Sequence, residues 1–160
     1  MTNTEMTRIY DRYSGAVYRT AFTMCKNTAD AEDITQETFI QRFRTDISFE
    51  DDRSEKSWLI RVAVNKCKDM FRSVRYKYFY YTVSLDEVDL IYETKDESEV
   101  YHAVMELPPK YRIVIHLYYY EGYSTAEIGK IIGRSETAVQ TQLYRARKKL
   151  KDKLGEEMYL

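Results

Sequence analysis

The chain has 160 residues, of which 44% are hydrophobic and 14% aromatic, so it can form one ordinary domain or two small ones with real cores. The formal net charge is only -1, which argues against a uniformly basic nucleic-acid binder. There is no signal-peptide core at the N-terminus and no apolar run near the roughly 18 residues that span a bilayer, so we expect a cytoplasmic protein without direct membrane insertion.

Apolar residues that recur at intervals of three and four, with few Gly and Pro, predict an all-α chain. A first helix is expected over about 5–26, with an apolar face of Ile9, Tyr13, Val17, Tyr18, Ala21 and Phe22. A second, over about 29–44 with Thr28 as its cap and an acidic first turn, places inward Ile34, Phe39, Ile40 and Phe43. A third, from about Ser54 to Lys77, has an inner face of Trp58, Leu59, Val62, Ala63 and Met70. These three helices are predicted to form one domain, residues 1–77.

Residues 78–96 mix Tyr, Val and acidic side chains without helical periodicity, which predicts a flexible acidic linker. A second domain of four helices, residues 97–160, is expected to follow. Pro109 suits the first turn of its second helix, whose apolar stripe consists of Ile113, Val114, Leu117 and Tyr118 and stops at Gly122.

The stretch from Ser124 to Leu154 predicts a helix-turn-helix. Ser124 and Glu127 form a capping box for a short helix, Gly133 interrupts the pattern, and Ser135 caps a long final helix. The interior positions are Ile128, Ile132, Val139 and Leu143. Gly129 stands at the helix crossing where Ala is expected, at a cost of about 1 kcal/mol in helix propensity. Such patterns also occur in purely structural bundles.

Charge is segregated along the chain despite the low total. Basic residues dominate 61–77 and 145–153, whereas acidic residues dominate 30–56 and 86–99. This alternation predicts two separate nucleic-acid contacts and at least one contact of the opposite sign.

The segment from 107 to 154, LPPKYRIVIHLYYYEGYSTAEIGKIIGRSETAVQTQLYRARKKLKDKL, resembles region 4 of bacterial sigma factors, which binds the -35 promoter element. DAEDITQETFIQRF and SWLIRVAVNKCKDMFR resemble the region 2 helices that grip the polymerase clamp and that recognise and melt the -10 element. Two motif sets in the right order are similar to the extracytoplasmic-function (ECF, group IV) sigma factors of the sigma-70 family, which lack regions 1 and 3. The resemblance implies a three-helix region 2 and a four-helix region 4.

The resemblance implies a polymerase-docking surface on the second helix for the clamp helices of core RNA polymerase. Its members recur at three and four on one face: Asp33, Gln36, Glu37 and Ile40. From the residues alone, an ordinary solvated acidic face is the preferred interpretation, and the docking role comes from the resemblance.

For the -10 element the resemblance implies a stripe on the third helix and a base-capturing loop from Ile47 to Arg53 with Phe49 at its centre. The stripe consists of Arg61, Asn65, Lys68, Asp69 and Arg72. Arg and Lys suit phosphates, whereas Asn and Asp can bond base edges, so Asp69 is expected to determine specificity. Trp58 is more typical of a core residue than of a base-stacking one.

For the -35 element the exposed face of the final helix supplies the candidates Gln140, Thr141, Tyr144, Arg145, Arg147 and Lys148. Arg145 suits guanine and Gln140 adenine, because each pairing satisfies two base-edge groups at once. Arg147 and Lys148 would neutralise phosphates, although cations at a helix C-terminus also complement the helix dipole.

The expected partners are core RNA polymerase, through its clamp helices and flap, promoter DNA and an anti-sigma factor. Composition alone is compatible with a soluble flexible spacer, whereas the resemblance implies an acidic segment that follows the RNA exit path of polymerase. The Tyr-rich patches at 76–81 and 118–120 are expected to contact either the flap or an inhibitor, and the sequence does not decide between the two.

An enzyme is the other class to consider. His102 and His116 stand on separate helices without ligands at metal-binding spacing, and no nucleophile motif or phosphate loop is present, so no catalytic residue, cofactor or metal is expected. Cys25 and Cys67 are expected to be reduced, semi-buried thiols.

The function predicted is a sigma factor that responds to stress or another signal. The alternative is a stand-alone helix-turn-helix regulator, or a sigma-like mobile-element regulator, that binds DNA without polymerase.

Overall fold

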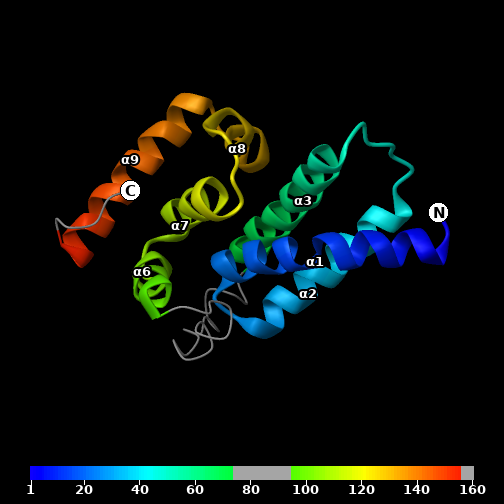
Figure 1. Ribbon diagram of the computed structural model, residues 1–160, viewed down its shortest axis with the longest axis horizontal. Coiled ribbons are helices and arrows are strands. Elements are labelled where there is room, and N and C mark those ends of the chain that lie inside the picture. Colours follow the sequence, from blue (N-terminus) through cyan, green and yellow to red (C-terminus); the bar gives the residue numbers. More distant parts are fainter. Residues whose placement is uncertain (74–94, 156–160) are drawn as a thin grey trace. The chain divides into compact units, whose positions relative to one another are not determined.

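The structure, a computed structural model, describes residues 1–73 and 95–155, and of residues 95–98 the backbone only. Every regular element in those ranges is a helix, so the all-α prediction is confirmed (Figure 1). The chain divides into two units, Met1–Tyr81 and Thr82–Leu160. Most of the predicted linker, residues 78–94, and the Tyr-rich patch at 76–81 lie outside the described residues.

Three helices make up the described part of the first unit: α1 (Asn3–Cys25), α2 (Thr28–Arg44) and α3 (Asp52–Arg72). The cap predicted at Thr28 is wrong, because Asn27 has the extended backbone of a cap and its side chain accepts from the Asp30 backbone N–H. Helix α3 ends at Arg72 rather than Lys77, since Ser73 turns to an extended backbone and donates to the Met70 carbonyl.

Each of the three helices packs against the other two around an apolar core (Figure 1). All predicted α1 positions are buried except the half-buried Tyr18. Two predicted core faces need correction. On α2, Ile34 and Phe39 are buried, but Phe43 is half-buried and Ile40 is 48% exposed. On α3, Trp58, Val62 and Met70 are half-buried, and the fully buried face, spaced at three and four, consists of Leu59, Ile60, Ala63, Val64 and Cys67.

The second unit contains α6 (Lys95–Met105), α7 (Pro109–Ile115), the π-helical turn η1 (His116–Tyr120), α8 (Thr125–Ile132) and α9 (Glu136–Leu154). Helix α6 begins at Lys95, so the last two residues of the predicted linker are helical. Pro109 occupies the first position of α7 as predicted, where its missing N–H costs nothing.

The helix that begins at Pro109 was expected to keep one apolar stripe as far as Gly122. Instead its last turn widens into η1. His116 and Leu117 are fully buried, whereas Tyr118 and Tyr119 are 36% and 37% exposed, so the prediction of an inward Tyr118 is wrong. A wider turn rotates the residues that follow it away from the α-helical register, which brings these tyrosines to the surface.

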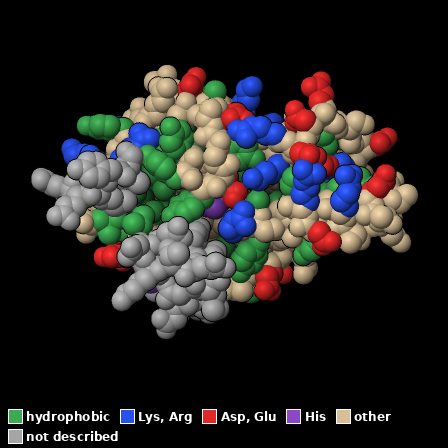
Figure 2. All heavy atoms as spheres, viewed as in Figure 1, with side chains coloured by type: hydrophobic (Ala, Val, Ile, Leu, Met, Phe, Trp, Pro, Cys, Tyr) green, Lys and Arg blue, Asp and Glu red, His purple; other side chains and the backbone are tan. Residues whose placement is uncertain are grey.

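The surface matches the low net charge. On the face drawn in Figure 2, Lys and Arg side chains lie among Asp and Glu side chains instead of forming one continuous basic surface.

Candidate nucleic-acid interface

Helix α9 has an apolar side that is buried and an opposite polar side that is exposed. Ser135 caps it, accepting a hydrogen bond from the Ala138 backbone N–H at 3.1 Å. Its buried side consists of Val139, Leu143, Ala146 and Leu150. On the opposite side Gln140, Thr141, Tyr144, Arg145 and Lys148 are all exposed. Five of the six side chains predicted to meet the -35 element thus share one accessible face, which has the size and chemistry for a major groove.

Arg147 differs from the other five. It is half-buried, its Nε donates to the Tyr119 hydroxyl at 2.7 Å, and its guanidinium carbon lies 5.5 and 5.6 Å from the ring centroids of Tyr118 and Tyr119. These contacts attach α9 to η1. Arg147 thus has a structural role that the sequence pattern does not indicate, at the edge of the predicted DNA-binding face.

The turn between α8 and α9 sets the angle of that face. Ser124 and Glu127 form the predicted capping box, and Gly133 ends α8 with a φ of 73°. The Thr125 hydroxyl donates to Glu136 across the turn at 2.8 Å. The two helices of the predicted helix-turn-helix are therefore joined by backbone geometry and by a side-chain bond as well as by their apolar contact.

On α3 the predicted -10 stripe is largely accessible. Arg61, Asn65, Asp69 and Arg72 are exposed and Lys68 is half-buried. Arg72 pairs with Asp69 at 3.2 Å, with both side chains about three-quarters exposed. Such an exposed pair is weak. Asp69 nevertheless has a cation beside it, which reduces the repulsion expected between its carboxylate and a phosphate backbone.

The loop at 45–51 joins α2 to α3, and its central Phe49 is not an open stacking surface. The Phe49 ring is half-buried, lies edge-on to Trp58 with centroids 5.9 Å apart, and has the Arg42 guanidinium carbon 4.9 Å from its centroid. Phe49 therefore anchors the loop. The exposed side chains at the middle of the loop are Asp46, Ile47 and Ser48.

The residues predicted to dock on polymerase share one face of α2. Asp33, Gln36, Glu37 and Ile40 are all exposed. Lys66 of α3 lies 3.9 Å from Glu37, a long contact whose Glu37 side chain is 63% exposed. Ile40, at 48% exposed, is the one apolar side chain among these four predicted docking residues.

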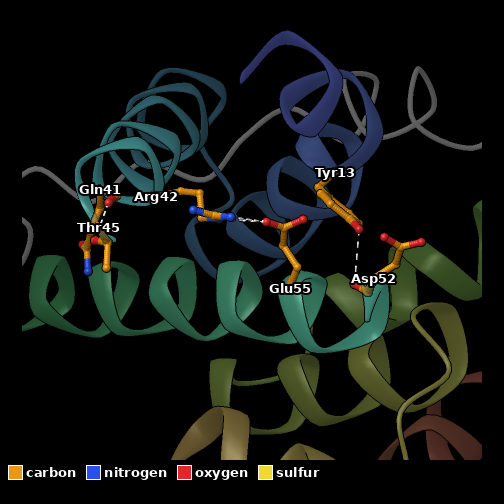
Figure 3. A network of polar contacts seen from close by, with 6 residues as sticks. All are labelled: Tyr13, Gln41, Arg42, Thr45, Asp52 and Glu55. Carbon is orange, nitrogen blue, oxygen red and sulfur yellow. Dashed lines mark hydrogen bonds and ion pairs between the residues drawn. The ribbon is translucent and has the colours of Figure 1, made fainter. Parts of the chain in front are cut away.

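Sequence reasoning missed the polar contacts that hold the start of α3 (Figure 3). Arg42 pairs with Glu55, the Tyr13 hydroxyl donates to the Asp52 carbonyl at 3.3 Å, and Arg12 pairs with the Asp52 carboxylate at 2.6 Å. One signal was available for the first contact. Arg42 continues the inward register of Thr35, Thr38 and Phe39, and a buried Arg is almost never left without a polar partner.

Two thiols meet in the core of the first unit. The Sγ atoms of Cys25 and Cys67 are 3.5 Å apart and both residues are fully buried. The contact with Cys25 and burial raise the pKa of the Cys67 thiol well above its usual value, which disfavours the reactive thiolate. They are free cysteines, as predicted, and more deeply buried than expected.

Within the described ranges, no group of three or more His, Cys, Asp or Glu side chains could hold a metal ion. None of the helices in the same ranges is both long and apolar enough to cross a bilayer.

Comparison with known proteins adds the family context for this geometry. Residues 9–76 match the family model for Sigma-70 region 2, and residues 97–150 match the model for Sigma-70, region 4. The chain is 30% identical over 162 residues to the ECF RNA polymerase sigma factor SigW of Bacillus subtilis, which covers 91% of this chain and 87% of SigW. It is 32% identical over 148 residues to the ECF RNA polymerase sigma factor BldN of Streptomyces coelicolor. That match covers 87% of this chain but only 56% of BldN, so the chain spans about half of that relative.

Solved structures share the fold. The sigma factor RpoE, in a co-crystal structure with the anti-sigma factor NepR from Bartonella quintana, has a TM-score of 0.72 at 20% identity and covers 92% of this chain and 95% of its own. CnrH, solved in complex with the cytosolic domain of CnrY, has a TM-score of 0.69 at 25% identity and covers 96% of this chain and 89% of its own.

Proposed function

Because this chain belongs to the family of ECF RNA polymerase sigma factors, we propose that it directs transcription initiation by binding core RNA polymerase and recognising the -10 and -35 promoter elements. The observation that carries this proposal is the exposed polar face of α9, the second helix of a capped helix-turn-helix, in a chain that also matches region 2. Sigma factors act by binding, so no catalytic residue is proposed.

The proposed -35 contacts follow from the chemistry of the exposed α9 side chains. Arg145 bonds guanine and Gln140 bonds adenine, each through two base-edge groups. Thr141 and Tyr144 contact sugar-phosphate or thymine methyl groups, and Tyr144, at 66% exposed, has the reach for either. Lys148 neutralises a phosphate. Arg147 supports this face through η1 and adds charge at its edge.

For the -10 element, the proposed contacts combine α3 with the loop at 45–51. Arg61, Lys68 and Arg72 bind phosphates, whereas Asn65 and Asp69 bond bases. Opening DNA costs about 1.4 kcal/mol per stacked step, so a melting protein must capture an unstacked base. The loop is proposed to capture such a base, with Phe49 as its internal anchor.

The α2 face of Asp33, Gln36, Glu37 and Ile40 is proposed to dock on the clamp helices of core polymerase, and the second unit on the flap. Since the target enzyme is cytoplasmic, so is the proposed site of action.

The proposed division of the chain is residues 1–77 for region 2, 78–96 for the linker and 97–160 for region 4. The short interval between the two matched segments leaves no room for a region 3 domain and supports group IV.

An anti-sigma factor is the proposed inhibitor. The support is the fold shared with the sigma factor RpoE, whose structure was solved in complex with the anti-sigma factor NepR. The exposed α2 face is proposed as part of the surface that such an inhibitor covers, because covering it would block polymerase.

Run-off transcription with core RNA polymerase from the same bacterium, on the promoter upstream of the protein's own gene, tests the function. We expect a discrete transcript only when the protein and core enzyme are both present. Binding of the free protein to the same DNA separates the two readings. A stand-alone regulator would bind its operator tightly without polymerase, whereas a sigma factor is expected to bind promoter DNA strongly only within the holoenzyme.

A further inference from the structure

Arg42 connects three separate parts of the first unit. Its Nε and Nη2 donate to the same Glu55 carboxylate oxygen, at 2.9 and 2.5 Å, which joins the end of α2 to the first turns of α3 (Figure 3). Its guanidinium also lies over the Phe49 ring, in the loop between those helices. One side chain therefore contacts both helices and the loop between them.

Burial of the Arg42–Glu55 ion pair removes two charges from water, which costs free energy. The side chains of Arg42 and Glu55 are 6% and 13% exposed, and Nη1 of Arg42 is buried without a hydrogen-bond partner in the described part of the chain. Apolar side chains of similar volume often match or exceed the stability of such a pair. A gain in stability therefore does not by itself explain why this buried pair is present. Fixing the conformation of the loop and of the start of α3 explains it better.

Both ends of the loop are also held. At its start, the Thr45 hydroxyl donates to the Gln41 carbonyl at 2.6 Å and the Thr45 N–H to the Arg42 carbonyl at 3.3 Å. At its end, Asp51 caps α3 by accepting from the Ser54 N–H at 2.7 Å, and Asp52 is held to α1 by the Tyr13 hydroxyl. The loop is fixed at its ends and at Phe49, while its middle remains exposed.

We propose that Arg42 and Glu55 are positioning residues for -10 recognition: by clamping Phe49 and the start of α3, they hold residues 46–48 in the conformation that captures an unstacked promoter base. This inference rests on the proposed function and assigns to the buried pair a role in base discrimination. Ordering a loop in advance removes the entropy cost of ordering it on binding, so losing the clamp should weaken capture of the correct base most.

The test measures binding of holoenzyme to fluorescent fork DNA whose single-stranded -10 segment carries each of the four bases in turn. Arg42→Met with Glu55→Leu replaces the pair by apolar side chains, and Glu55→Gln is a milder change that keeps an oxygen acceptor. For the double variant, we expect the preference for the correct base to fall about tenfold at one or more -10 positions. Glu55→Gln should show a smaller loss at the same positions. Core binding and -35 duplex affinity should be unchanged.

The matched control is Arg8→Met with Asp11→Leu, which exchanges an Arg and an acidic residue for the same two apolar residues at exposed positions of α1. It should keep the full base preference. If the double variant and Glu55→Gln both keep it too, the positioning role is wrong. If the double variant instead loses core binding and base binding in parallel, the pair is merely structural and the inference also fails. A wild-type holoenzyme without any base preference would overturn the proposed -10 function itself, a result distinct from either failure.

Discussion

The carbonyl oxygen of Arg134 lies 2.6 Å from the position that a β-carbon on Gly129 would occupy. Gly129 stands inside α8, where the turn into α9 folds back against it, and its own carbonyl accepts the Arg134 N–H at 2.9 Å. Real β-carbons essentially never approach backbone this closely. The Ala expected here from helix propensity would therefore displace the turn, and the glycine sets the approach of α8 and α9.

Gly129→Ala should accordingly destabilise the second unit, although Ala favours an isolated helix by about 1 kcal/mol. We expect a net loss of about 1 to 3 kcal/mol in the free energy of unfolding, since backbone must shift to relieve the contact. Chemical denaturation measures it.

Gly15→Ala on α1 is the control, because a β-carbon there would meet only the Arg19 Nη1 at 3.1 Å, the far end of a flexible side chain. That change should leave stability unaltered or raise it. A Gly129→Ala protein as stable as the wild type would show that the turn adapts freely.

Variants of Arg145 and Lys148 should distinguish recognition of a base by α9 from non-specific attraction to phosphates. Arg145→Ala should cost about 1 to 3 kcal/mol and relax preference at one -35 position, because it removes a base-edge contact. Lys148→Ala should weaken all sequences alike and lower the salt slope by about one. Holoenzyme binding to a library of -35 sequences at several salt concentrations distinguishes the two variants. If both variants lose affinity equally for all sequences, Arg145 does not contact a base and the proposed base-reading residues of α9 are wrong.

Tyr119→Phe tests the support that η1 gives to α9. It removes the hydroxyl that accepts from Arg147 while keeping the ring, so stability should fall by up to about 1 kcal/mol. The affinity for -35 DNA should fall slightly, with an unchanged salt slope, because no cation is lost. Tyr118→Phe, whose hydroxyl is not the acceptor of the Arg147 Nε, is the matched control. Equal effects of the two changes would argue against a specific role for the Tyr119 bond.

The cap of α3 should make the first unit sensitive to acid. Hydrogen bonds from Ser54 lower the pKa of the Asp51 carboxyl. A lowered folded-state pKa means that this stabilisation is present above the unfolded-state pKa and is lost as the pH falls through the folded-state pKa. Asp51→Asn keeps a good cap without the titration. The difference in free energy of unfolding between the two proteins, measured with urea, should therefore be constant near neutral pH. Below about pH 4 the wild type should lose stability relative to Asp51→Asn.

Features encoded within a few residues were predictable from the sequence. The Ser124 and Glu127 capping box, the Ser135 cap and Pro109 at the start of α7 all depend on side chains beside the backbone they contact. Neighbouring candidates remain ambiguous at this level. Asn27 and Thr28 both have side chains that cap helices, and only the backbone conformation at Asn27 decides between them.

Features that depend on packing between elements were not predictable. The segment HLYYY contains no Gly or Pro to mark the change to a π-helical turn. Trp58 looked inward by residue type, yet α3 buries Ile60 and Val64 and leaves Trp58 half-exposed beside Phe49. The Arg42 and Glu55 pair joins two helices across a loop whose path a periodicity cannot specify.

The α2 face gives the sharpest test of polymerase docking. Asp33→Lys with Glu37→Lys reverses two exposed charges while leaving the buried positions of α2 intact, so helicity measured by circular dichroism should not change. A basic partner surface would meet like charge, which costs several kcal/mol at an interface, and a pull-down with core polymerase should recover almost none of this variant. Asp11→Lys with Glu50→Lys makes the same charge change at other exposed positions of the first unit and should bind normally. If the α2 variant binds as well as this control, the clamp-docking assignment is wrong; if both variants fail, net charge rather than the α2 face governs the encounter.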